Sequence, residues 1–535
     1  MIKGLKILLL SIGVFFVSAP IFSQTTLNWH WKDLTQESIH GVSLEKAKLA
    51  LKQTGIQPKN IIIAVLDGGI DTNHLALKNT IWTNTKEIPN NHLDDDHNGY
   101  VDDIHGWNFI GGKDGRNIDK LSDEKSRVYH AYKSLYTSPT FDSTKVVESE
   151  KKQYHQWLAA ANEINFTEED RASLQYITIS RNVIKKIATT VLKEIADSNF
   201  SVSQLNQFEP LSRIGVEAKL TYIRTNTILG IDTSAHYKDL LQDLNDYIEG
   251  KEKAATAKEQ APTPIRAQII QDNYFDLSDK YYGNNDIMGP NAKHGTHVAG
   301  LASNNEPIIK IMGVRVVPDG DEYDKDIALG IRYAVDNGAK IINMSFGKSF
   351  SPQQGWVDSA IRYAAQKDVL LIHSAGNEKY DLNTKQVYPN PYSDIFQDTA
   401  NNMITVAASS DSSIKGTLLT DFSNFGNKVV DIISPGDKIY STLPNNNYGY
   451  LSGTSMASPI VSHIAALIRA YYPQLSAIEV KKILIQSCWK PTDPEAASAL
   501  SNIAKSGGII NAAKAVEFAA TFPVKDNKKK KTYKN

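Results

Sequence analysis

The stretch NIIIAVLD (residues 60–67) decides the fold class of this chain. Its apolar residues are continuous and rich in Ile, which is typical of a strand covered on both faces in a parallel sheet. Comparable runs recur at IIKIMGVRVV (308–317), AKIINMSFG (339–347), DVLLIHSAGN (368–377), MITVAAS (403–409) and VVDIISPG (429–436). These runs are the candidate strands of one buried sheet.

Helical patterns lie between several of these runs. The segment 324–338 is one of them, and its apolar stripe consists of Ile327, Ile331, Ala334 and Val335. Further along, Ser476 and Glu479 have the spacing of a capping box. This alternation predicts a three-layer α/β domain with a mostly parallel central sheet. Active sites in such sheets lie at the carboxyl ends of the strands.

The segment 113–275 departs from this alternation. It has no Ile/Val run and is rich in Lys, Glu, Gln, Asn and Ser. Within 182–196, one predicted helical face holds Val183, Ile184, Ile187, Val191, Leu192 and Ile195. KEKAATAKEQAPTP (251–264) is interpreted as a polar linker. We therefore expect a mainly helical insertion at 113–275, interrupting one domain formed by 24–112 and 276–522.

The two ends of the sequence have biased compositions. A positive start and the apolar run 7–17, followed by small residues, predict a signal peptide over 1–23 and therefore an exported protein. Its final location would be the periplasm, the cell surface or the medium. Residues 523–535 are interpreted as a basic disordered tail. Because Cys488 is the one cysteine of the sequence, an intramolecular disulfide is excluded. We expect Cys488 to be buried and to pack like a small apolar residue.

The net charge excludes some classes of partner. With a net charge of −1 and a sequence pI of about 6.9, no global field favours nucleic acid or an anionic membrane. No apolar run after the signal peptide is long enough to span a membrane, so we expect no integral membrane segment in the mature chain. The sequence specifies no oligomeric state.

Two short stretches place catalytically useful oxygens at the ends of elements. In AVLDGGID (64–71), Asp67 ends an apolar strand. In GTSMASP (453–459), Ser455 stands at the start of an apolar helix, with Pro459 expected in the first turn. Free N–H groups and the helix dipole would stabilise an oxyanion beside that serine. Considered without the other motifs, Asp67 is interpreted as a strand-end residue that starts a turn, and Ser455 as the N-cap of a helix.

A third stretch, KHGTHVAG (293–300), supplies two histidines at a predicted helix start. Alone, His294 and His297 read first as structural residues, next as a metal-binding pair, and last as a catalytic base with a bystander. The three stretches together change this order. A serine nucleophile needs a base, and the base needs a carboxylate that fixes its tautomer.

The motifs VLDGGID, HGTHVAG and GTSMASP resemble those of the subtilisin-like serine proteases, the subtilase family. The resemblance covers about 55–112 and 286–520, and the Asp–His–Ser order agrees with it. It implies that Asp67 is the orienting carboxylate, His294 the general base and then acid, and Ser455 the nucleophile that forms an acyl-enzyme. It leaves His297 as a packing residue.

The same resemblance implies substrate contacts for two further segments. In SAGN (374–377), Asn377 would donate its amide to the oxyanion, with the Ser455 N–H as second donor; losing such a donor costs about 3–4 kcal/mol. The segment 345–347 would pair with the backbone of a polypeptide substrate. The expected substrate-binding residues are Ser345, Phe346, Gly347, Ser374, Ala375 and Gly376.

Two departures from the family pattern concern access and activation. Asp67 and His294 are 227 positions apart (294 minus 67), and the helical insertion accounts for this distance. The insertion could shape the substrate cleft, restrict access to it or bind a partner. Only about 24–55 precedes the first strand, which is shorter than the usual subtilase propeptide.

The acidic stretch LDDDHNGYVDDIHGWNF (93–109) resembles a calcium loop. Carboxylate or amide oxygens at alternate positions precede Gly99, and position 12 is His105 instead of Glu. We expect a structural Ca²⁺ ion bound by Asp94, Asp96, Asn98, Tyr100, Asp102 and Asp103. The alternatives are a solvated acidic turn and zinc bound by His92, His97 and His105.

Three functions are consistent with these residues. The first is an exported serine endopeptidase, and it is favoured because all four catalytic positions are filled. The second is a binding or scaffold protein whose site is occluded by the helical insertion. The third is a metalloenzyme built on His294 and His297.

Overall fold

The computed structural model describes residues 27–229, 231, 233, 235–392, 400–412 and 416–523. The predicted signal peptide and all but the first residue of the predicted tail lie outside these residues. The chain forms two compact units. The helical unit comprises Lys125–Pro262, and the sheet unit comprises the described residues up to Glu124 and from Thr263 onward.

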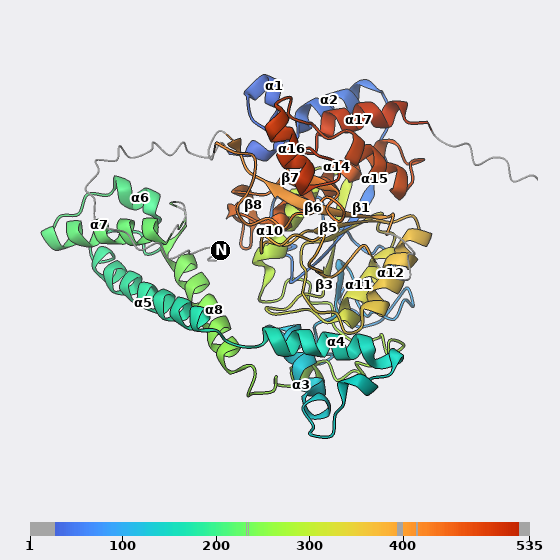
Figure 1. Ribbon diagram of the computed structural model, residues 1–535. Coiled ribbons are helices and arrows are strands. Elements are labelled where there is room, and N and C mark those ends of the chain that lie inside the picture. The colour runs from blue at the N-terminus through green and yellow to red at the C-terminus, as the bar shows by residue number, and fades with distance from the viewer. Residues whose placement is uncertain are drawn as a thin grey trace, which may run out of the picture. The chain divides into compact units, whose positions relative to one another are not determined.

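The sheet unit contains a seven-stranded sheet in the order β2-β3-β1-β4-β5-β6-β7 (Figure 1). Every neighbouring pair is parallel, so the predicted α/β fold with a mostly parallel sheet is confirmed. The strands are β1 (Ile61–Asp67), β2 (Gly106–Asn108), β3 (Ile309–Arg315), β4 (Ile341–Met344), β5 (Leu370–Ser374), β6 (Met403–Ser409) and β7 (Ile432–Pro435). Each Ile/Val run contains one of these strands, and only the short β2 lies outside them.

Helices cover both faces of the sheet, as the continuous apolar runs predict. In β1, Ile63 and Val65 belong to one core cluster, whereas Ala64 and Leu66 belong to the other. The first cluster includes residues of α10 (Ala292–Ser303) and α14 (Thr454–Tyr471). The second includes residues of α11 (Asp324–Asp336) and α12 (Gln354–Gln366). The sheet is therefore the middle of three layers.

A two-stranded antiparallel hairpin, which the sequence patterns did not predict, supports α10. It consists of β8 (Ile439–Leu443) and β9 (Asn447–Leu451). Ser441 Oγ donates to the carbonyl of His297, and Thr442 Oγ1 donates to the carbonyl of Thr296. A Cβ at Gly300 would lie 2.2 Å from Thr442 Oγ1, so this helix needs a glycine to approach the hairpin.

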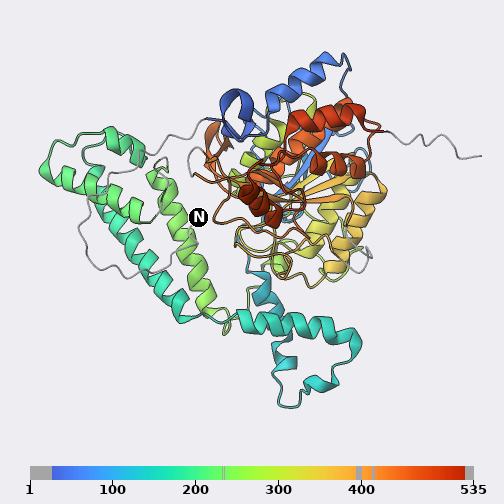
Figure 2. The ribbon, with the colours of Figure 1, turned by 45° about the horizontal axis from the view of Figure 1, so that its top comes forward.

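The first and last described elements of the sheet unit pack together. They are η1 (Trp29–Trp31), α1 (Leu34–Glu37) and α2 (Leu44–Gln53), and at the other end α15 (Ala477–Gln486), α16 (Pro494–Ile503) and α17 (Ala512–Thr521). Figures 1 and 2 both draw α2 beside α17. The Ala512 N–H donates to the Val42 carbonyl at 2.7 Å, and Trp29 is 0% exposed. This N-terminal segment is part of the core.

Smaller predictions for the sheet unit agree with the structure. The stripe of α11 is buried at Ile327, Ile331, Ala334 and Val335. Ser476 and Glu479 form the predicted capping box of α15. Cys488 is buried, as expected. The short helix α9 (Ile265–Ile269) follows the helical unit.

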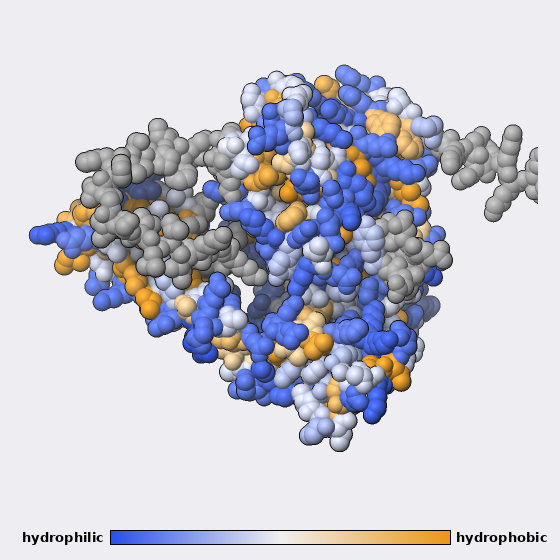
Figure 3. Space-filling view, viewed as in Figure 1, coloured by the Kyte–Doolittle hydropathy of each residue, from blue (hydrophilic) through white to orange (hydrophobic). Residues whose placement is uncertain are grey.

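The helical unit has a core of its own, which includes Ile184, Tyr222 and Leu244. Its helices are α3 (Glu124–Tyr136), η2 (Ser143–Lys145), α4 (Glu148–Glu163), α5 (Glu168–Val191), α6 (Val202–Gln207), α7 (Arg213–Ile228) and α8 (Tyr237–Thr256). The interpretation of 251–264 as a linker was wrong for its first part, because α8 continues to Thr256. The predicted apolar face was wrong at Val183, which is 37% exposed. Apolar residues are also visible on this unit in Figure 3.

Candidate active site

Asp67 and His294 form a direct pair at the carboxyl end of β1. The Nδ1 atom of His294 lies 3.0 Å from Asp67 Oδ1 and 2.9 Å from Oδ2. Asp67 is the last residue of β1 and is 3% exposed, and its Oδ1 also accepts the Gly68 N–H. His294 lies in the first turn of α10, as predicted. A Cβ at Gly295 would lie 2.2 Å from the Gly69 carbonyl, so glycine allows α10 to approach this turn.

Opposing effects act on the protonation of His294. Burial lowers the pKa of the imidazole, whereas the charge of Asp67 and its hydrogen bond raise it, and the net result is a pKa above the ordinary value. The side chain is 41% exposed, so part of the imidazole is open to solvent. The pair has the charge arrangement of a base oriented by a carboxylate.

His297 has a different environment from His294. It is 0% exposed, and its Nε2 lies 3.0 Å from the Ile439 carbonyl and 3.2 Å from the Gly449 carbonyl. Burial lowers its pKa to about 3, so the ring is neutral and donates to the hairpin. The two histidines direct their bonded nitrogens at different groups, a carboxylate and two carbonyls. This geometry does not support a shared metal ion, and His297 is a packing residue.

Ser455 lies in the first turn of α14, where free backbone N–H groups face outward. Its Oγ donates to the carbonyl of Ser345 at 3.1 Å. In return, Ser345 Oγ donates to the Ser455 carbonyl at 3.0 Å. Among the described residues, Ser455 Oγ forms no hydrogen bond to His294.

Pro459 explains why the Ser455 carbonyl accepts that bond. The first-turn position predicted for Pro459 was wrong, because α14 begins at Thr454 and the proline lies inside the helix. A residue at this position normally donates to the carbonyl four residues earlier, which is that of Ser455, and proline has no N–H. The freed carbonyl is taken by the hydroxyl of Ser345. A helix defect thus joins the 345–347 segment to the turn that carries Ser455.

Asn377 lies against the start of the same helix. Its Oδ1 accepts the Thr454 N–H at 2.9 Å and the Thr454 hydroxyl at 3.1 Å. Thr454 Oγ1 also accepts the Gly376 N–H at 3.0 Å. Because the oxygen of the amide is held by Thr454, its Nδ2 is the atom available for an oxyanion. Thr454 was not singled out from the sequence, although it lies inside the GTSMASP motif.

The segment 345–347 follows β4 and is not part of a strand in this structure. The Phe346 carbonyl lies 2.8 Å from His373 Nε2, and burial lowers the pKa of His373 to about 4, so the neutral ring donates. Lys348 exchanges two backbone hydrogen bonds with Tyr388. One edge of the segment is therefore occupied by protein. The Ser345 carbonyl accepts the Ser455 hydroxyl instead, and Gly347 is exposed.

The other predicted substrate-binding residues are less accessible. Ser374 is 3% exposed and Ala375 is 0% exposed, whereas Gly376 is half-buried. The Ala375 carbonyl accepts Asn424 Nδ2 at 2.8 Å. A Cβ at Gly376 would lie 2.4 Å from Asn424 Nδ2, and Gly376 has a φ of +99°. These residues form a constrained turn at the end of β5.

A model of the subtilase family matches residues 58–505 of this sequence. The chain belongs to the subtilase family. The predicted class, a serine-type endopeptidase, is confirmed by this membership and by the relatives. Thermitase of Thermoactinomyces vulgaris is 37% identical over 216 residues, which are 37% of this chain and 71% of thermitase. The major intracellular serine protease of Bacillus subtilis (strain 168) is 34% identical over 223 residues, 39% of this chain and 64% of that protease.

Another subtilase relative shares much less of its length with this chain. The cell wall-associated protease of Bacillus subtilis (strain 168) is 36% identical over 220 residues, which are 39% of this chain but 22% of that protein. A solved subtilase cytotoxin SubAB structure is 26% identical with a TM-score of 0.37, covering 43% of this chain and 77% of that one.

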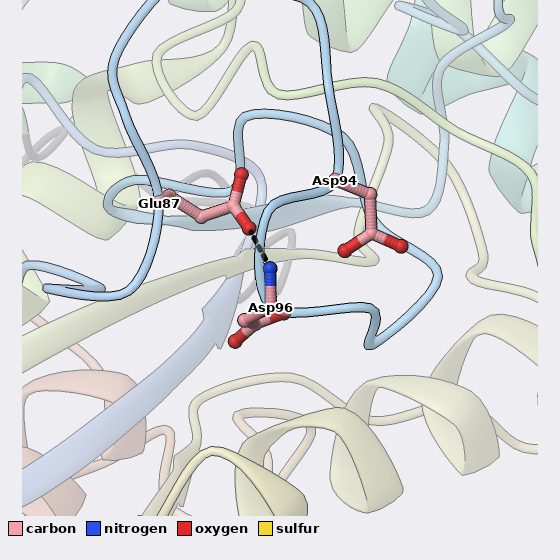
Figure 4. Close-up of side chains that lie close together, drawn as sticks. All are labelled: Glu87, Asp94 and Asp96. Carbon is pink, nitrogen blue, oxygen red and sulfur yellow. Dashed lines mark hydrogen bonds between the residues drawn. The ribbon is translucent and has the colours of Figure 1, made fainter.

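In this member of the subtilase family, the acidic loop gathers three carboxylates. Ligand oxygens of Glu87, Asp94 and Asp96 lie within 4.8 Å of one another (Figure 4). Glu87 was missed from the sequence, because it precedes the first predicted ligand, Asp94, by seven residues and fits no motif spacing. Its Oε1 accepts the Asp96 N–H at 3.1 Å, which places it in the group. Burial raises the pKa of Glu87, and the charges of Asp96 and Asp95 raise it further.

The remaining predicted ligands of the loop have protein partners. Asn98 Oδ1 accepts the Tyr100 N–H, and Asp103 accepts from Asn84, Asn98 and Tyr333. Asp102 Oδ2 accepts the His92 N–H, and its buried Oδ1 has no protein partner. Within the described part of the chain, His92, His97 and His105 form no group of converging ligand atoms, and His92 is 91% exposed. Hard oxygen donors fit Ca²⁺ better than Zn²⁺.

Proposed function

We propose that this protein is an exported endopeptidase that hydrolyses peptide bonds through an acyl-enzyme on Ser455. The observation that carries the proposal is the contact of His294 Nδ1 with both carboxylate oxygens of Asp67. This contact holds the proton on Nδ1, so Nε2 is the lone-pair nitrogen that can act as a base. Ser455 would reach it by rotation about χ1, since catalytic hydrogen bonds are often formed only with substrate bound.

The proposed reaction has two halves. Ser455 Oγ attacks the scissile carbonyl carbon while His294 Nε2 takes the hydroxyl proton, and the leaving amine then takes that proton as the C–N bond breaks. Water next attacks the ester, loses a proton to His294, and the proton returns to Ser455 Oγ. Asn377 Nδ2 and the Ser455 N–H would donate to the oxyanion in both halves. Asp67 stabilises the imidazolium formed at each step.

Polypeptides are the proposed substrates because the 345–347 segment is exposed at Gly347, where an extended backbone could pair with it. Gly347 is exposed, whereas the opposite edge is occupied by Tyr388 and His373. Ser374, Ala375 and Gly376 would border the site for the residue before the cut. Backbone pairing predicts that chain conformation matters more than most side chains in substrate choice.

Export is proposed from the sequence of residues 1–23, with its positive start and apolar run. None of the described helices combines the length and the apolar composition that crossing a membrane requires. A periplasmic, cell-surface or extracellular location would follow.

A structural calcium ion is proposed in the acidic loop. Glu87, Asp94 and Asp96 would hold it, since their ligand oxygens already converge. A cation there would relieve the repulsion of the carboxylates and stabilise the loop next to β2. Asp102 is a further candidate, because it has a buried oxygen without a protein partner. The other ligands expected from the sequence are Asn98, Asp103 and the Tyr100 carbonyl.

Covalent labelling tests the proposed nucleophile. A fluorophosphonate probe should label the full-length wild-type chain at Ser455, as read by peptide mass spectrometry. Labelling should disappear in Ser455→Ala and persist in Ser452→Ala, because Ser452 bonds to Asp437 and Lys438 instead of the site. Wild-type protein that binds calcium, is folded and takes no label would contradict the proposal.

The occluded binding protein is the second candidate, motivated by the 227-position separation of Asp67 and His294. A small probe and a large substrate distinguish the two candidates in the full-length chain. An open endopeptidase should react with the probe and also digest casein. Occlusion predicts labelling of Ser455 with casein left intact.

A further inference from the structure

Lys348 is a buried cation directly after the proposed substrate edge. The residue is 3% exposed and its ammonium is enclosed by three acceptors. The Nζ atom lies 2.9 Å from Glu124 Oε2, 2.9 Å from Asp324 Oδ1 and 2.6 Å from the Glu322 carbonyl. A buried lysine is stable only when its charge is compensated in this way. The side chain therefore fixes the position of its own backbone.

That backbone in turn fixes the edge formed by Ser345, Phe346 and Gly347. The Lys348 N–H donates to the Tyr388 carbonyl at 3.0 Å, and the Tyr388 N–H donates to the Lys348 carbonyl at 2.8 Å. A Cβ at Gly347 would lie 3.3 Å from the Tyr388 carbonyl, so the two segments are in close contact. The edge is held by Lys348 at one end and by the Ser345–Ser455 bonds at the other.

One partner of Lys348, Glu124, lies where the helical unit joins the sheet unit. Glu124 is the last residue of the sheet unit before the helical unit begins at Lys125. Asp324 starts α11, and its carboxylate also accepts from Ser351 Oγ and the Gln353 N–H. The following Lys325 bonds Asp272, which lies after the helical unit.

From these contacts we infer that Lys348, anchored by Glu124, is a positioning residue that holds the 345–347 edge in register for the backbone of an extended peptide. This inference rests on the proposed function. The pair Lys348–Glu124 makes the junction of the insertion part of the substrate-binding apparatus. Long substrates, which pair with several residues of the edge, depend on it, whereas acylation of Ser455 by a small reagent does not.

An effect of Lys348 on the register of the 345–347 edge can be distinguished from an effect on the stability of the fold. Lys325 supplies a matched control, because it is also a fully buried cation at the start of α11. Its Nζ bonds Asp272 Oδ2 at 2.6 Å and the Asn273 carbonyl at 2.7 Å, and neither group belongs to the edge. A purely structural effect should be similar for Lys348→Met and Lys325→Met.

The test compares kcat and KM for a tetrapeptide amide and for a single-residue ester, in full-length protein quantified by active-site titration. In Lys348→Met and in Glu124→Gln, we expect KM for the tetrapeptide to rise at least tenfold. Hydrolysis of the ester and the rate of fluorophosphonate labelling should change less than twofold. Lys348→Arg should restore most of the tetrapeptide KM, and Lys325→Met should leave it within twofold.

The inference is overturned if the tetrapeptide and the ester lose activity equally, or if Lys325→Met raises the tetrapeptide KM as much as Lys348→Met. If Lys348→Met does not fold, Glu124→Gln decides by the same criteria, because it keeps the size of the side chain and an acceptor oxygen. Failure of the proposed function would be visible separately, as wild-type protein that neither takes label nor cleaves the ester.

Discussion

His294 is the residue whose charge state controls the proposed reaction. Desolvation disfavours its imidazolium form, and Asp67 at 2.9 Å favours it strongly enough to raise the pKa above 6.5. A base must be neutral to accept a proton. Asp67 makes His294 a stronger base. Because it also keeps the imidazole protonated up to a higher pH, it lowers the expected activity at acidic pH.

The pH profile of kcat/KM tests this balance. We expect the acid limb to have a midpoint above 6.5, the ordinary value for histidine, because protonated His294 cannot accept the Ser455 proton. Asp67→Asn should lower the imidazole pKa, followed by NMR, since only the lowering effect of burial is left. A midpoint that stays in place in the Asp67→Asn protein would show that Asp67 does not set it.

The two ends of the Asn377 amide have different proposed roles, and substitutions can distinguish them. Its Nδ2 would donate to the oxyanion, and its Oδ1 accepts from Thr454. Asn377→Ala should lower kcat by about 10²–10³-fold with little change in KM, because the bond strengthens only in the transition state. Thr454→Val keeps the oxyanion donor and should lose much less. Equal losses would show that Asn377 acts mainly by anchoring the helix start.

Among individual residues of the site, those within recognisable sequence motifs could be predicted. Those whose role depends on contacts in the folded structure were missed. Asp67, His294 and Asn377 could be found because their segments have recognisable patterns. Glu87, Thr454 and Lys348 could not be assigned, since their roles come from neighbours distant in the sequence. The tie between Ser345 and Ser455 spans 110 positions and depends on the N–H that Pro459 lacks.

At the scale of elements, the N-terminal segment contributes large buried side chains to the core. Trp29 is 0% exposed, and its Nε1 donates to the Asp437 carbonyl at 3.2 Å. Leu44 and Leu51 of α2 belong to the same core cluster as α14 and α17. The segment lies within residues 24–55, a stretch shorter than the usual subtilase propeptide, and it packs into the core of the sheet unit.

Removing the Trp29 side chain should destabilise the sheet unit by about 3–5 kcal/mol, the usual cost of a large cavity in a core. The measurement is urea unfolding of Trp29→Ala followed by circular dichroism. Leu27→Ala is the control, because Leu27 is 53% exposed and such surface changes stay within about 0.5 kcal/mol. Similar effects for the two variants would show that the segment is not part of the cooperative core.

Elements with a long or periodic apolar pattern were predictable, and short polar ones were not. The Ile/Val runs and the stripe of α11 identify elements buried on one or two faces, because burial requires apolar side chains there. β2 has three residues, and the β8–β9 hairpin has exposed or half-buried residues along β9. Their stability comes from the sheet edge and from α10, which a local pattern does not contain.

Across the whole molecule, each compact unit has a separate hydrophobic core. Units with separate cores commonly unfold in separate transitions. The proposed calcium residues all lie in the sheet unit. Binding to the folded loop would therefore stabilise that unit by mass action.

Scanning calorimetry should show two transitions, and calcium should raise the midpoint of only the one that belongs to the sheet unit. At a free calcium concentration 100 times the Kd, the gain is about 2.7 kcal/mol. Asp96→Asn should abolish the shift. Asp95→Asn should preserve it, because Asp95 bonds the Ile88 N–H and Asn91 outside the converging group. A calcium shift retained in Asp96→Asn would contradict the assigned ligands.

The pairing of α2 with α17 also constrains where the chain can be cut during maturation. Any cleavage after Trp29 would detach core residues that precede β1, so the fragment would have to stay bound for the sheet unit to keep its stability. The N-terminal residue of the mature protein should therefore lie at or before Trp29, which N-terminal sequencing can establish.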